Sequence, residues 1–183
     1  MEATQFIEIF THVRILIAMI ISLSIARILS GVARFLQHPK RNRISALHLL
    51  WVFSMLLELI LFWWWGVRLS KDVEWTFVAF AFQIGYAITL FLMTALLFPD
   101  DIAEYKGYQD FFIQRRYWFF TLLALTWIID ISKAIVAGGN ISSTLLLHAS
   151  VTLSLCALAA FFKHPKIQIA IVLIYISRQL LSI

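Results

Sequence analysis

Seven polar or ionisable side chains interrupt long apolar runs of this sequence, and their residue types suit the binding of ions. They are Arg14, Glu58, Gln83, Asp130, Lys133, His148 and Arg178. A carboxylate can bind a cation or exchange a proton, a neighbouring base can adjust its affinity, and a histidine can relay or gate the proton. A charged group at the centre of a bilayer costs about 2.5–3.5 kcal/mol or more, so each of these residues is a candidate for function.

The overall composition is typical of a membrane protein. The chain has 183 residues, of which 62% are hydrophobic and 14% are charged, whereas soluble domains have about 45–50% apolar and about 25% charged residues. The net charge of +5 comes from bases that lie between apolar runs, so we expect the lipid bilayer as a partner and not nucleic acid. The single cysteine, Cys156, lies in an apolar run, and no spacing typical of a metal or haem site occurs, so no metal or cofactor is expected.

Six apolar runs are long enough, or nearly so, to cross a bilayer. About 20 residues span the roughly 30 Å hydrocarbon core, and such segments must be helical to satisfy their backbone. The sequence therefore predicts an all-α polytopic membrane helix bundle that forms a single domain over residues 1–183. Its predicted spans are 7–32, 44–66, 74–98, 117–137, 143–162 and 167–183.

The segment 99–116 between the third and fourth spans is long enough for a short element of its own. Pro99 ends the third helix, and an aspartate after it caps a new one. The segment is either an ordered loop without a function of its own or an element that lies on the membrane surface with Tyr105, Phe111 and Phe112 among the headgroups.

Lysine and arginine gather in one set of connections, which sets the expected orientation. That set holds Arg34, Lys40, Arg41, Arg43, Lys106, Arg115, Arg116, Lys163 and Lys166, whereas the opposite set holds Arg68 and Lys71. Because basic loops stay in the cytoplasm, both termini are expected outside. We expect a multi-pass protein of a cell membrane, namely a bacterial inner membrane.

Counting residues from the cytoplasmic ends of the spans brings five of the seven candidate residues to similar depths. Glu58, Asp130 and His148 come out about 20 Å from the cytoplasmic boundary at about 1.5 Å per residue, with Gln83 and Arg178 close to them. The other two lie nearer the outside. Three interpretations remain open: ion pairs that fix the helices in register, a seam for a partner helix, or a water-filled vestibule that binds a solute.

A second group of polar residues lies in the inner half of the expected bundle. Ser24, Arg27, Gly31 and Arg34 recur at helical spacing and form a basic stripe on the first span. No span carries an acid at that depth, so Arg27 either extends to the interface or meets a lipid headgroup or a partner's carboxylate. Arg27, Arg34 and His48 are therefore predicted to contact lipid or a partner.

The motif His-Pro-Lys ends two similar stretches, "ARFLQHPK" at 33–40 and "AAFFKHPK" at 159–166. The similarity fits a parallel internal repeat. It also fits two independent helix ends, because proline often follows a helix and basic residues suit its C-terminal dipole.

The motifs of hydrolases and of phosphate-binding loops do not occur, so no catalytic residues are assigned and an enzyme is not the expected class. The preferred function is a small channel or transporter with an outward-facing charged pocket for an ion, a proton or a small polar solute. The alternative is a non-enzymatic membrane subunit or sensor that docks lipids or other membrane helices. Either protein can act as a homo-oligomer or together with other membrane subunits.

Overall fold

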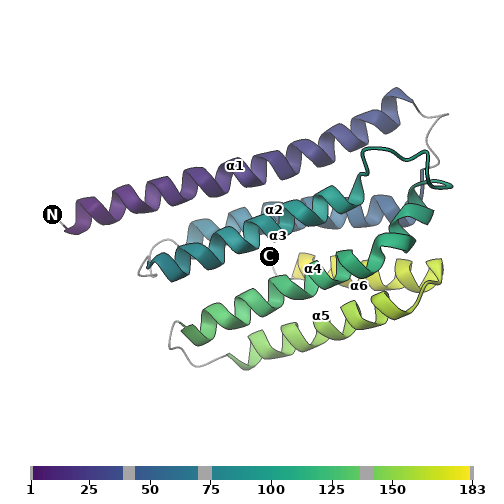
Figure 1. The fold of residues 1–183 in the computed structure, drawn as a ribbon. Coiled ribbons are helices and arrows are strands. Elements are labelled where there is room, and N and C mark those ends of the chain that lie inside the picture. The colour runs from purple at the N-terminus through teal and green to yellow at the C-terminus, as the bar shows by residue number, and fades with distance from the viewer. Residues whose placement is uncertain (1, 39–43, 70–75, 137–141, 182–183) are drawn as a thin grey trace.

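The computed structural model describes residues 2–38, 44–69, 76–136 and 142–181. These residues form six α-helices: α1 (Glu2–Gln37), α2 (Ala46–Leu69), α3 (Phe77–Leu97), α4 (Tyr108–Val136), α5 (Ser143–Phe161) and α6 (Pro165–Leu181) (Figure 1). Within the described ranges, α1 to α5 each contain a stretch long and apolar enough to cross a membrane. The chain is thus an all-α bundle with the helices of a multi-pass membrane protein.

Five of the helices close into a ring. Along it, α2 packs on α3, α3 on α4, α4 on α5, α5 on α6, and α6 returns to α2. Among the described residues, α1 contacts α3 and α2 alone, so it lies outside the ring along one edge of the bundle (Figure 1). Side chains that line the ring therefore come from α2 to α6.

The interior nearer the α3–α4 connection is filled by aromatic rings. Trp51 on α2 is 1% exposed. Its ring centroid lies 5.1 Å from those of Phe119 and Phe120 and 5.9 Å from those of Phe112 and Tyr175. These contacts join α2, α4 and α6 and fill the middle of the ring at this end.

Helix α4 begins at Tyr108, well before the predicted span 117–137. Phe111 and Phe112 belong to this helix and are 5% and 1% exposed, so the predicted surface element with these two rings in the headgroups is wrong. Mean hydropathy is low in this turn because polar residues alternate with phenylalanines that face the bundle. Gly107 precedes the helix with a φ of 149°, a backbone conformation that favours glycine.

Several expectations concern residues outside the described ranges. The connection bases Lys40, Arg41, Arg43 and Lys71 fall there, as do the predicted span ends at residues 74, 137 and 183. The orientation in the membrane accordingly stays a prediction.

The second His-Pro-Lys motif, residues 164–166, lies between two helices and contains the first residue of the second one. Helix α5 ends at Phe161, and Pro165 is the first residue of α6. Proline suits this position because an N–H in the first turn would have no acceptor within the helix. The buried amide of Gln168 donates to the carbonyl oxygens of Ala159 (2.6 Å) and Phe162 (2.7 Å) and so holds the turn. In the first motif α1 runs to Gln37, and the proline and lysine lie outside the described residues.

The basic stripe of α1 faces α3 of the same chain. Arg27 Nη2 donates to the Phe98 carbonyl oxygen and pairs with Asp100 Oδ1, both at 3.0 Å. A Cβ atom added at Gly31 would overlap the Phe98 ring, so the glycine permits this close approach. The carboxylate that pairs with Arg27 thus comes from Asp100 in the connection after α3. The prediction from the sequence considered acids within the spans only, so it did not include this residue.

His48 is fully buried, so its predicted contact with lipid or a partner is wrong. Its Nε2 donates to the Leu97 carbonyl oxygen at 2.7 Å. The rings of Phe35, Phe98 and Tyr108 surround it, with centroids 5.9, 5.2 and 4.9 Å away. The residue joins α2 to the end of α3. For Arg34, a contact with lipid or a partner stays a prediction.

Candidate functional site

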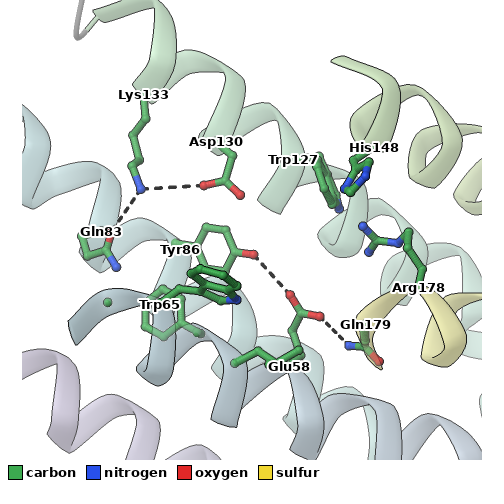
Figure 2. A pocket seen from close by; sticks show the side chains of 13 residues that line it. Glu58, Trp65, Gln83, Tyr86, Trp127, Asp130, Lys133, His148, Arg178 and Gln179 are labelled. Atoms are coloured by element: carbon green, nitrogen blue, oxygen red, sulfur yellow. Dashed lines mark hydrogen bonds and ion pairs between the residues drawn. The ribbon is translucent and has the colours of Figure 1, made fainter. Parts of the chain in front are cut away.

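A cavity of about 260 Å³ opens inside the ring, between α2, α3, α4, α5 and α6 (Figure 2). Six of the seven candidate residues line it, namely Glu58, Gln83, Asp130, Lys133, His148 and Arg178. The seventh, Arg14, is on α1, outside the ring, where its guanidinium carbon lies 5.9 Å from the Trp63 ring centroid. The cavity therefore brings together candidate residues that are far apart in the sequence. Glu58 and Arg178, for example, are separated by 120 positions.

Local structure places these side chains at the end of the bundle that carries the α2–α3 and α4–α5 connections. Thr76 caps α3 by accepting from Ala79 N at 3.2 Å, and Gln83 follows two turns later. Ser142 caps α5 by accepting from Thr144 N at 3.2 Å, and His148 follows. By the predicted orientation, this end faces the outside.

Glu58 is held by neutral donors. The Tyr86 hydroxyl donates to its Oε1 at 3.4 Å, and the Tyr175 hydroxyl and Gln179 Nε2 donate to its Oε2 at 3.0 and 2.5 Å. Ser54 in turn donates to Gln179 Oε1 at 3.0 Å, which orients the amide. In the described part of the chain no basic side chain pairs with Glu58, although the sequence predicted compensation by bases.

Asp130 and Lys133 form the ion pair that their spacing of three predicts. Lys133 Nζ lies 3.8 Å from Asp130 Oδ1, and the two side chains are 29% and 32% exposed. Lys133 Nζ also donates to Gln83 Oε1 at 3.2 Å, which links α4 to α3. The pair is therefore on the open side of the cavity and is already engaged.

Arg178 is packed between aromatic rings. Its guanidinium carbon lies 4.9 Å from the Trp127 ring centroid and 4.8 Å from that of Tyr175. Within the described residues no carboxylate lies within 4.0 Å of it, and its buried Nε has no hydrogen-bond partner. Figure 2 shows His148 on the same side of the cavity as Arg178 and away from Lys133.

Sequence reasoning missed the neutral residues that complete the site. Tyr86 and Tyr175 lie one turn from Gln83 and Arg178, and Gln179 is the next residue along from Arg178. A search for hydrogen-bonding side chains one turn from a candidate residue would have found Tyr86 and Tyr175, and a further turn from Tyr175 would have led to Gln179, because residues three or four apart share a helix face.

The arrangement can bind a small charged or polar species, since it offers carboxylates, a guanidinium, an ammonium and an imidazole around one space. In the described ranges, no group of three or more His, Cys, Asp or Glu residues could hold a metal ion. Comparison of the chain with protein-family models, curated proteins and solved structures gave no match.

Proposed function

We propose that this is a six-span protein of a cell membrane, with both termini outside, that binds an ion, a proton or a small polar solute in the cavity and conducts it. The observation that supports this most is the meeting of six polar residues from five helices around one space. The described part of α6 has 17 residues, which at 1.5 Å per residue reach about 25 Å and nearly cross the hydrocarbon core.

The size of the cavity limits what it can hold. A volume of about 260 Å³ corresponds to roughly eight or nine water molecules at about 30 Å³ each. It lies just below the range of about 300–1,000 Å³ found for pockets that take drug-sized ligands. The ligand is therefore an ion with part of its hydration shell, or a solute of a few heavy atoms.

The alternative function, a subunit that docks other membrane helices, has less support. Two of its three proposed contact residues are engaged within the chain, since Arg27 pairs with Asp100 and His48 is buried. Residues that already have partners within the chain are less available for contacts with another membrane helix.

Flux into proteoliposomes tests the proposal. The uptake of Na⁺, K⁺, H⁺ and Cl⁻ is measured separately at several pH values, and we expect at least one to enter faster than into empty vesicles. Asp130→Asn removes a negative charge from the cavity and should change that flux about tenfold, downward for a cation and upward for an anion, the effect of roughly 1.4 kcal/mol. The control Lys166→Gln changes an exposed base outside the cavity and should leave it unchanged. If none of the four enters faster than into empty vesicles, conduction of ions and protons is refuted.

A further inference from the structure

We infer that the ligand of this cavity is a small anion, such as chloride or a short carboxylate, and that Arg178 binds it, with His148 as a second donor. The inference rests on the proposed function and specifies its ligand class. It reverses the simpler expectation that the two acids of the cavity bind a cation.

The carboxylates of the cavity already have their partners. Three donors converge on the two oxygens of Glu58, and Asp130 pairs with Lys133. A cation at Glu58 would compete with donors that already hold both of its oxygens, among them the Gln179 amide, which Ser54 holds in place. A cation bound at Asp130 would meet the Lys133 ammonium 3.8 Å away.

Arg178, in contrast, has no anionic partner in the described part of the chain. Arg178 is partly buried, and its Nε is buried without a hydrogen-bond partner among the described residues. Charged groups that are removed from water are normally paired and hydrogen-bonded. The rings of Trp127 and Tyr175 contact the guanidinium carbon. Stacking on aromatic rings leaves the edge of a guanidinium, with its N–H donors, for a planar or spherical anion. The missing partner is therefore an anion that enters from the cavity.

His148 stands where it can assist. It lines the same cavity, and among the described residues its ring makes no hydrogen bond or ion pair. An imidazole N–H can donate to an anion held by Arg178 from a different helix, α5 against α6. The charges of Glu58, Asp130, Lys133 and Arg178 sum to zero. An anion can still bind, because the guanidinium of Arg178 has no anionic partner among the described residues, whereas the other three charged groups already have partners.

Equilibrium binding with radiolabelled ions tests the inference. The purified full-length protein in nanodiscs is mixed with labelled acetate, chloride or sodium. We expect saturable binding of acetate or chloride that excess sodium does not compete away. Arg178→Gln should weaken it about tenfold or more, the size typical of losing a charge-assisted hydrogen bond of about 1.5–3 kcal/mol. Arg178→Lys keeps the charge and should retain part of the binding, while Lys166→Gln should retain all of it.

The outcomes separate this inference from the proposed function. Saturable sodium binding without anion binding would overturn the anion and leave the solute-binding cavity standing. Anion binding that is equal in wild type and a folded Arg178→Gln variant would overturn the role of Arg178. The comparison of acetate with sodium uses the wild-type protein. It therefore decides between an anion and a cation as the ligand even if a variant fails to fold. Absence of binding by every ion, together with absence of flux, would overturn both proposals.

Discussion

Replacing Trp51 with alanine will lower the free energy of unfolding by about 3–5 kcal/mol, the usual loss when a buried Trp or Phe is truncated. The indole is 1% exposed and contacts rings from α4 and α6. Its removal leaves a cavity that no neighbouring ring can fill without breaking its own contacts, because interiors are close-packed.

Unfolding in mild detergent by titration with a denaturing detergent measures the effect of Trp51→Ala. Trp118→Ala is the matched control, since Trp118 is 58% exposed on α4 and should change stability by no more than about 0.5 kcal/mol. Equal losses in the two variants would show that the aromatic interior does not hold α2, α4 and α6 together.

Replacing Glu58 with alanine will have the second largest effect, a loss of about 2–5 kcal/mol. The change removes the acceptor of the Tyr175 hydroxyl and of one N–H of Gln179, whose amide keeps its bond to the Ser54 carbonyl oxygen at 3.2 Å. Each buried unsatisfied donor costs about 1–3 kcal/mol. The same network joins α2 to α3 and α6, so its loss loosens the ring around the cavity.

The variant Glu58→Gln separates the hydrogen bonds from the charge. A glutamine oxygen in the place of Oε2 still accepts from Tyr175 and Gln179, so its loss of stability should be less than half that of Glu58→Ala. Denaturing-detergent titrations of the two variants give the comparison. If both lose the same stability, the charge of Glu58 rather than its acceptor oxygens stabilises the site.

The existence of the helices could be predicted from the sequence, but some boundaries could not: α1 runs from Glu2 to Gln37 around the predicted span 7–32, and α4 begins nine residues before the span 117–137. Apolar runs mark segments that lipid surrounds, and a helix of the described region forms around each predicted span. The first turns of α4 are different because Phe111 and Phe112 face the bundle while polar residues face outward. Mean hydropathy averages the two faces, so it placed the start of that helix at residue 117.

Depth along each helix could also be predicted, because every residue adds a fixed rise. This is why Glu58, Asp130, His148 and Arg178 were expected at similar heights, and the structure brings them to one cavity. Rotation about each helix axis and the order of the helices around the bundle do not follow from a residue count. A residue count therefore did not predict that Arg14 lies on the helix outside the ring, or that neutral donors rather than bases hold Glu58.

The claim that water reaches the charged cavity within the membrane can be tested most directly by thiol labelling. Cys156, the single cysteine of the chain, is first replaced by alanine, and cysteine is then placed at His148 or at its neighbour Leu147. Leu147 is 61% exposed on the outer surface of the bundle, which faces lipid in the proposed arrangement. Thiols react as thiolates, which form in water and not in lipid.

A charged, membrane-impermeant methanethiosulfonate is then added to intact cells and to opened membranes. We predict that cysteine at position 148 is modified in both preparations and that cysteine at position 147 is modified in neither. Modification at 147 but not at 148 would contradict the account, because the charged residues would then surround a dry interior.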